Sequence, residues 1–392
     1  MGFVNSENRL TTKVRDFVSI RANNLIYVDK TSYIQKIAES RAPVLLARPD
    51  GFGKTTIVST LEELFKHGIK PYDDHDSFFK GLDIEKTWND TGTYHVLRLD
   101  FSDDFSPSYD PNTLETVLIN KIKKSALEFG IKLKDSNLDV SDYLRDFCEK
   151  SKDNSLVLLI DDYDFYLVNN LDNSDLFNKF AKILGAIFCI LKNQLSKFRC
   201  IFLTGITRFK DGTIYSTGNI IADKSLNAEY GAIAGFTTDE IKEHFHDNLI
   251  DAIANSYNLI PSDVTDEKID SLLDELTKWY GGYCFDSSFK TKVFSSNSLI
   301  EFLADFDLKT RKICLSNITN LEVVKNSIQS ILKNSKESVG EYFVNSNSFE
   351  NPYALDDLDE KVMLYQLGYL TLAREPNFLG YFLKIPNFCI SN

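Results

Sequence analysis

The chain has 392 residues, of which 43% are hydrophobic and 26% charged, a composition typical of a folded globular protein. Its formal net charge of −13 argues against a surface that binds nucleic acid across a whole face, so such binding is not indicated, although a local basic cleft stays compatible with it. The six cysteines show no metal-binding or paired spacing. Without a long apolar run or a leader-like N-terminus, we expect a cytoplasmic protein that does not span a membrane.

The segment that follows Val44 has the pattern of a phosphate-binding loop. An apolar run, Val44–Ala47, leads into a glycine-containing turn and then into a helical pattern that begins near Lys54. In such a strand–turn–helix, backbone N–H groups face the phosphates, the lysine contacts the terminal ones and the threonine hydroxyl binds Mg²⁺. Position 48 holds Arg where the usual pattern has Gly, so an ordinary strand–turn–helix with a surface lysine is the alternative. The residues predicted to bind nucleotide are Arg48, Gly51, Phe52, Gly53, Lys54, Thr55 and Thr56, with Thr55 also a magnesium ligand.

A second site element follows the apolar run Leu156–Ile160. Five consecutive apolar residues closed by acids indicate a buried parallel strand that delivers carboxylates to the edge of the sheet where ligands bind. We therefore predict that Asp161 is a magnesium ligand and that Asp162 is the acid that orients the attacking water. The alternative is that both acids only end the strand.

A third element is the run Cys200–Gly205, which predicts another buried strand. A polar side chain at the tip of such a strand, and an arginine just beyond it, are suited to contact the γ-phosphate. Thr204 and Arg208 are the candidates for this catalytic role. Alternatively, Arg208 pairs with a nearby acid.

Strands and helices alternate over the first part of the chain. Expected strands at 44–47, 94–102, 156–160 and 200–205, and a short one near Ala232, alternate with helices that include 112–129, 138–151 and 175–195. Residues 236–240 then predict a capping box that opens the next helix. This alternation predicts an α/β fold, a P-loop NTPase three-layer sandwich with a mostly parallel sheet, as a first domain over residues 1–245.

The second half changes to helices at 249–255, 264–279, 297–306 and 321–332, followed by an expected surface loop at 340–357. A helix at 358–368 and a hairpin with strands at 369–373 and 381–385 then predict a winged-helix-like end. The second predicted domain, 246–392, is thus a mainly helical lid with a winged-helix-like C-terminal region. Because the hairpin offers only Arg374 and Lys384 as positive charge, we expect this region to bind a protein partner.

Several ordered motifs carry a family resemblance: Tyr27-Val28-Asp29-Lys30-Thr31, Arg48-Pro49 with Phe52-Gly53-Lys54, Leu159-Ile160-Asp161-Asp162-Tyr163-Asp164, Leu203-Thr204-Gly205-Ile206-Thr207-Arg208-Phe209, Gly235-Phe236-Thr237, Trp279–Phe285 and Leu364–Thr371 with Ile385-Pro386-Asn387. Together they resemble the predicted AAA-ATPase-like family of bacteria. Its members are P-loop ATPases that often carry a C-terminal PD-(D/E)xK nuclease-like domain, which is not expected in this chain. The resemblance implies that the helices after the last strand close over the nucleotide.

Departures from the family pattern bear on catalysis. Where the family usually has two arginines in the loop, this chain has Asp50 and Gly51, and Asp162 stands where the family usually has Glu. Since catalysis depends on placement to within about an ångström, the shorter acid is expected to slow hydrolysis on the order of a hundredfold and to leave binding intact.

The function predicted from the sequence is an ATP-binding, Mg²⁺-dependent and weak hydrolase that acts as a nucleotide-controlled switch. The alternative is a catalytically decayed pseudo-ATPase that serves as a protein-interaction module. A third hypothesis, a DNA-acting ATPase, rests on family association alone. No motif separates ATP from GTP, and assembly into an oligomer stays open.

Overall fold

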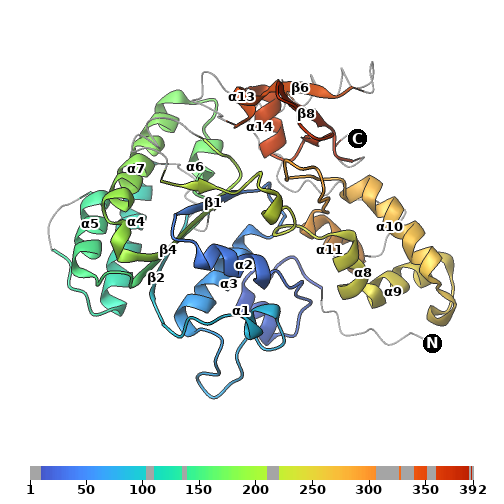
Figure 1. Ribbon diagram of the computed structural model, residues 1–392, viewed down its shortest axis with the longest axis horizontal. Helices are drawn as coiled ribbons and strands as arrows, with labels where there is room; N and C mark the ends of the chain where they lie inside the picture. Colours follow the sequence, from blue (N-terminus) through green and yellow to red (C-terminus); the bar gives the residue numbers. More distant parts are fainter. Residues whose placement is uncertain are drawn as a thin grey trace.

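The fold is known from a computed structural model, which describes residues 10–102, 110–134, 139–209, 220–305, 326–327, 340–350, 359–387 and 390. Its centre is a five-stranded sheet with the strand order β2-β3-β4-β1-β5 (Figure 1). Every pair of neighbouring strands is parallel, as the sequence predicted. The strands are β1 (Val44–Ala47), β2 (His95–Asp100), β3 (Leu156–Asp161), β4 (Phe198–Gly205) and β5 (Ala222–Asp223).

Helices cover both faces of this sheet, which explains why all six residues of β3 are buried. The group α1–α3 lies on one side and the group α4, α5 and α7 on the other (Figure 1). Several starts follow from local chemistry; the helix α4, for example, begins at a proline after the capping side chain of Asp110. The helices are α1 (Phe17–Ala22), α2 (Thr31–Glu39), α3 (Lys54–His67), α4 (Pro111–Glu128), α5 (Val140–Lys150), α6 (Phe165–Val168) and α7 (Ser174–Asn193), with short 3-10 turns at Asp83–Lys86, Leu195–Lys197, Ala228–Tyr230 and Pro261–Asp263.

The fifth strand differs from the prediction. We expected a short strand near Ala232, but β5 lies ten residues earlier and pairs Ala222 with Val44 of β1. Residues 231–235 instead form turns and bends, and the carbonyl of Ala232 accepts a hydrogen bond from the Lys30 ammonium. The sequence did not predict this strand because a two-residue edge strand carries no hydrophobic pattern of its own, and its position depends on tertiary packing.

A second group of helices lies beside the sheet domain (Figure 1). Thr237 and Glu240 form the predicted capping box at the start of α8. These helices share a hydrophobic core that also takes in Leu10 and Val28 from the N-terminal segment. The predicted helices at 249–255, 264–279 and 297–306 are present; the one at 321–332 lies outside the described residues except for 326–327. The group consists of α8 (Thr238–His244), α9 (His246–Tyr257), α10 (Asp266–Tyr280) and α11 (Ser296–Asp305).

The C-terminal region contains the expected helix and hairpin, together with a third strand. The strands form an antiparallel sheet with the order β6-β8-β7. The surface loop predicted at 340–357 is wrong over 342–350, where a strand and a helix bury Val344 and Phe349; residues 351–357 lie outside the described part. The winged-helix assignment stays a prediction. The elements are β6 (Tyr342–Asn345), α13 (Ser346–Glu350), α14 (Glu360–Gln366), β7 (Thr371–Leu372) and β8 (Gly380–Lys384).

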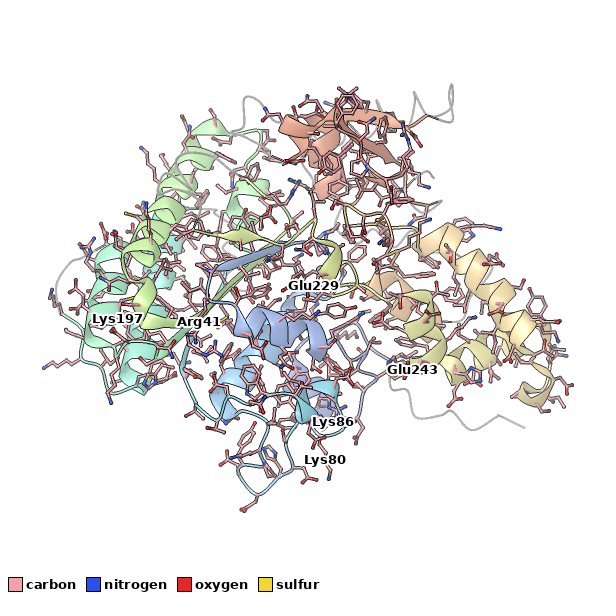
Figure 2. All side chains as sticks on the ribbon, viewed as in Figure 1. Arg41, Lys80, Lys86, Lys197, Glu229 and Glu243 are labelled. Atoms are coloured by element: carbon pink, nitrogen blue, oxygen red, sulfur yellow. The ribbon has the colours of Figure 1, made fainter. Side chains whose placement is uncertain are left out.

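The division of the chain at residue 245 also stays a prediction. The largest hydrophobic core joins residues from both sides of it, among them Phe52, Phe285 and Leu383. Two ion pairs lie far apart on the surface: Lys80 and Lys197 lie at separate edges of the molecule (Figure 2), 2.6 Å and 2.9 Å from carboxylate oxygens of Asp76 and Asp153.

Candidate functional site

The turn between β1 and α3 has the backbone geometry of an anion-binding loop. Gly51 and Gly53 have φ angles of +83° and +92°, in the left-handed region that favours glycine. Gly53 occupies the N-cap position of α3, so no side chain caps the helix that begins at Lys54. The first N–H groups of α3 therefore face a position where a phosphate could accept their hydrogen bonds.

Lys54 is buried at the start of α3, between two carboxylates. Its Nζ atom lies 2.7 Å from Oδ1 of Asp50 and 3.6 Å from Oδ1 of Asp162. Burial by itself lowers the pKa of this ammonium, but the charges of Asp50 and Asp162 raise the pKa above its ordinary value on balance. Lys54 is therefore charged, and it meets an acid from its own loop as well as one from the end of β3.

Asp161 and Asp162 stand at the carboxyl end of β3. Asp161 is fully buried, and neither carboxylate oxygen has a hydrogen-bond partner among the described residues. Burial, together with the charges of Asp162 and Asp100, raises the pKa of Asp161 to about 7. Asp162 has a φ angle of +48°, which turns its side chain away from the line of the strand and brings it to the Lys54 ammonium.

The predicted magnesium ligands are Thr55 and Asp161. Asp161 has two buried carboxylate oxygens without a hydrogen-bond partner, and a hard divalent cation prefers such oxygen ligands. The hydroxyl-bearing Thr55 lines the same cavity as Asp162. Within the described part of the chain, no three His, Cys, Asp or Glu side chains are arranged to hold a metal ion on their own. Asp161 itself is fully buried and does not line the cavity, so its role as a magnesium ligand stays a prediction.

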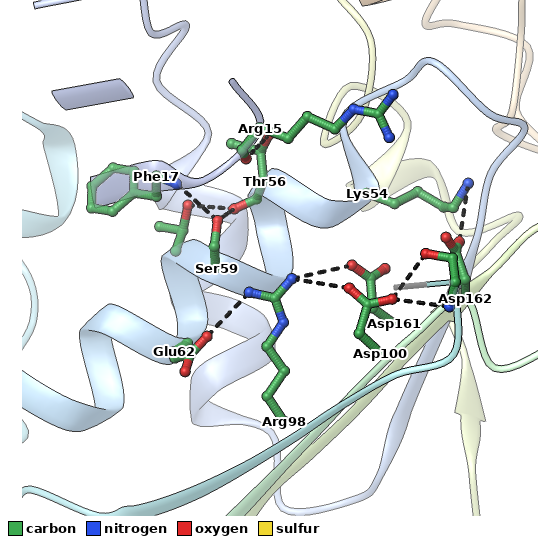
Figure 3. A network of polar contacts seen from close by, with 12 residues as sticks. Arg15, Phe17, Lys54, Thr56, Ser59, Glu62, Arg98, Asp100, Asp161 and Asp162 are labelled. Carbon is green, nitrogen blue, oxygen red and sulfur yellow. Dashed lines mark hydrogen bonds and ion pairs between the residues drawn. The ribbon is translucent and has the colours of Figure 1, made fainter. Parts of the chain in front are cut away.

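Arg98 of β2 joins the acids of this region (Figure 3). Its guanidinium nitrogens lie 3.2 Å from Glu62 on α3, 3.4 Å from Asp100 and 3.7 Å from Asp161. Asp100 and Asp161 are paired residues in the register of β2 and β3, which is why one guanidinium reaches both. Arg98 therefore holds three carboxylates from three elements in a fixed arrangement behind Asp162.

Asp164 fixes the ends of β3 and β4 to each other. Its buried carboxylate accepts hydrogen bonds from the backbone N–H groups of Ile206 and Thr207. Burial raises the pKa of Asp164 to about 6, despite these hydrogen bonds. The contact requires glycine at position 205, because a Cβ there would lie 2.3 Å from an Asp164 oxygen.

Thr204 and Arg208 do not line the cavity that contains Lys54. The Thr204 hydroxyl donates to the carbonyl of Leu46 across the pair of β4 and β1, at 2.8 Å. The Arg208 guanidinium is buried, donates to the carbonyl of Phe349 at 2.6 Å and lies 3.6 Å from Asp223. Arg208 thus pairs with an acid, which was the alternative to a catalytic role. Contact of Thr204 or Arg208 with a γ-phosphate would require these bonds to break.

Arg48 also turns away from the loop. Its buried guanidinium donates to the carbonyls of Ala47, Ser225 and Tyr230 and stacks on the ring of Phe285. The predicted contact of Arg48 with phosphate is therefore wrong for this structure, in which the Arg48 side chain joins β1 to the segment after β5. Of the predicted binding residues, Gly51, Phe52, Gly53, Lys54, Thr55 and Thr56 line the cavity and Arg48 does not.

The cavity has a volume of about 710 Å³. One wall is the loop with the start of α3, and the opposite walls come from segments far away in the sequence. Apolar side chains such as Leu10, Leu25 and Ile26 form part of the N-terminal wall. The other wall segments are Asp162 with Asp164, residues 295–298 at the start of α11, and residues 367–369 after α14.

The loop is braced by the second half of the chain. The carbonyl of Gly51 accepts a hydrogen bond from the N–H of Asn297 at 3.0 Å. The ring of Phe52 packs edge-on against Tyr283 and Phe285, with centroid distances of 4.9 Å and 5.1 Å. A Cβ added at Gly368 would lie 2.9 Å from the Cβ of Pro49, so the C-terminal region also meets the loop closely.

Sequence reasoning missed two contributors to the cavity. Arg15 and the 295–298 segment line it, although neither belongs to a recognisable motif. Residues 367–369 lie within the motif quoted for the family resemblance, and that motif could have placed them. Only the packing of distant segments brings the first two to the loop.

A parallel α/β sheet whose first strand enters α3 through this loop defines the P-loop class of fold. A family model described as predicted AAA-ATPase matches residues 12–215, slightly more than half of the 392 residues. The chain belongs to this predicted AAA-ATPase family, as the motifs indicated. A protein described as an uncharacterized protein in the vnfD 5′ region of Azotobacter chroococcum mcd 1 is 22% identical over 392 residues, which cover 97% of this chain and 68% of that protein.

The sequence predicted a cytoplasmic protein that does not span a membrane. No helix in the described parts of the chain combines the length and apolar character needed to cross a bilayer. The cytoplasmic location itself stays a prediction.

Proposed function

We propose that the chain binds a nucleoside triphosphate with Mg²⁺, ATP foremost, and hydrolyses it slowly. One observation carries the proposal: the Lys54 ammonium at the start of α3 and the Asp162 carboxylate from β3 meet 3.6 Å apart in one cavity of about 710 Å³. That volume lies within the range of nucleotide-sized ligand sites. Family membership supports nucleotide binding independently.

Each group has a proposed role. Lys54 contacts the terminal phosphates, and the glycine-containing turn wraps them with backbone N–H groups. Thr55 and Asp161 are the proposed magnesium ligands, and the ion supplies charge stabilisation for the developing negative charge on the phosphates. Asp162 accepts a hydrogen bond from the attacking water. The apolar N-terminal wall, with Leu25 and Ile26, receives the base.

The proposed role as a nucleotide-controlled switch follows from the contacts that brace the loop. Because Gly51 is hydrogen-bonded to Asn297 and Pro49 packs on Gly368, a loop that moves around phosphates must carry these contacts with it or break them. Nucleotide binding is thereby linked to the C-terminal region, where we place the contact with a protein partner.

The test of binding uses the full chain and isothermal titration with ATP and Mg²⁺. We expect binding by the parent protein and a loss of at least about tenfold in affinity on Lys54→Ala, since a charge-assisted contact to phosphate is removed. An unchanged affinity in Lys54→Ala would contradict the proposal. Lys66→Ala, on the exposed end of the same helix, is the matched control.

A second function is favoured by the short contact between Asp50 and Lys54. An acid 2.7 Å from the phosphate-binding lysine is what a decayed site would show, and the chain would then act as a protein-interaction module. Phosphate release separates the two functions. Asp162→Glu, which restores the family's usual residue, should raise turnover in a weakened enzyme and leave a pseudo-ATPase at background.

A further inference from the structure

Among the described residues, three cationic side chains line the cavity: Arg15, Lys30 and Lys54. Lys30 forms an ion pair with Glu240 and donates to the carbonyl of Ala232. Lys54 lies between Asp50 and Asp162. Two of the three positive charges are thus already balanced by carboxylates before any anion enters.

Arg15 is the exception. Its side chain is exposed, and no ion pair of its guanidinium is found among the described residues. Figure 3 shows the Arg15 side chain beside the first turns of α3, extending in the direction of the Lys54 side chain. A guanidinium with its donors free is suited to bidentate contact with phosphate oxygens.

The backbone that carries Arg15 is fixed to the phosphate-loop helix. The hydroxyl of Thr56 donates to the carbonyl of Arg15 at 2.8 Å, and the N–H of Phe17 donates to the hydroxyl of Ser59 at 2.9 Å. The Phe17 ring is fully buried between Tyr27 and Phe79. Two hydrogen bonds and a buried ring therefore place the Cα of Arg15 against the start of α3, while the side chain keeps the freedom to close on a ligand.

Charge balance explains why such a residue matters here. The loop carries Asp50 and glycine rather than additional cations, so its own lysine is neutralised at 2.7 Å. A polyphosphate entering the cavity needs positive charge from another segment. We propose that Arg15 is a polyphosphate-binding residue, which supplies from the N-terminal segment the charge that the loop lacks. This inference rests on the proposed nucleotide binding.

The experiment measures binding of inorganic tripolyphosphate and of ATP with Mg²⁺ to the full chain by isothermal titration. Arg15→Gln is expected to weaken both by about tenfold and to reduce the dependence of affinity on salt, while AMP, with a single phosphate, loses less. Arg15→Lys should recover part of the loss, because it restores the charge without the fork geometry.

Lys13→Gln is the matched control, since Lys13 lies on the same exposed segment and does not line the cavity. An Arg15→Gln protein that binds as the parent does, or a Lys13→Gln protein that loses as much, would overturn the role of Arg15 and leave nucleotide binding intact. A parent protein that binds neither tripolyphosphate nor ATP would overturn the proposed function along with it. Thermal unfolding of each variant checks that the fold is retained.

Discussion

The ion pair between Asp50 and Lys54 predicts that the Asp50 carboxylate competes with a bound phosphate for the Lys54 ammonium. A triphosphate that contacts Lys54 must displace the Asp50 carboxylate, which lies 2.7 Å from the ammonium. The variant Asp50→Asn keeps the size of the side chain and removes its charge. We therefore expect Asp50→Asn to bind ATP with Mg²⁺ more tightly than the parent protein.

The size of the gain follows from the geometry. A pair of unit charges at this separation interacts by roughly 1.5 kcal/mol in a water-like dielectric and by roughly 6 kcal/mol at an effective dielectric constant of 20. The Asp50 side chain is 44% exposed, so the value lies nearer to the lower limit. A gain of about 1.5–3 kcal/mol corresponds to about ten- to hundredfold tighter binding.

The assay is isothermal titration of the full chain at fixed ionic strength, in a cycle that includes Lys54→Ala. The gain should vanish when Asp50→Asn is combined with Lys54→Ala, because the lysine is then no longer there to be released. Asp76→Asn is the control: Asp76 also pairs with a lysine four residues on, Lys80, at 2.6 Å, but lies outside the cavity. Equal or weaker binding by Asp50→Asn would refute the reasoning.

Three further predictions concern stability, each measured by urea unfolding. Because burial, with the charges of Asp162 and Asp100, raises the pKa of Asp161 to about 7, the folded protein retains a proton that the unfolded chain loses near pH 4. The free energy of unfolding should fall as pH rises from about 4 to about 7, and Asp161→Asn should remove this decline, on the order of a few kcal/mol; parallel pH profiles would count against it. Gly205→Ala should cost about 1–3 kcal/mol, since its Cβ would lie 2.3 Å from Asp164, and an unchanged midpoint would contradict that contact. Arg48→Lys should lower the free energy of unfolding by about 1–3 kcal/mol, because carbonyls are left unpaired, and should leave the ATP affinity of the folded protein unchanged. Weaker ATP binding by this variant would show that Arg48 belongs to the nucleotide site.

The sheet could be predicted from the sequence because its strands are strong local signals. Runs such as Val44–Ala47 and Leu156–Ile160 are apolar throughout, which is the pattern of parallel strands covered on both faces. The same logic places acids from the end of β3 near Lys54, since parallel strands deliver their ends to one edge, but it did not predict that Asp162 is the acid paired with the lysine. Elements without such a pattern were missed, as at β5 and over 342–350, where burial of Val344 and Phe349 outweighs an asparagine-rich local composition.

The direction of the side chains at the site was harder to predict from the sequence than the positions of the strands. Arg48 and Arg208 stand at the predicted strand ends, yet both guanidiniums turn toward carbonyls of later segments. A buried arginine takes the acceptors that tertiary packing offers, and sequence spacing does not reveal them. Arg15 shows the converse: it lies in no motif and comes to the cavity only because its backbone is bound to α3.

The bracing of the phosphate loop limits how the molecule can be dissected. A fragment restricted to residues 12–215, the span of the family match, would lack Tyr283, Phe285 and Asn297. The aromatic ring at position 52 would then face water, and the carbonyl at position 51 would lose its backbone donor. Such a shortened protein would report on a loosened loop, so affinities measured on it would understate those of the intact chain.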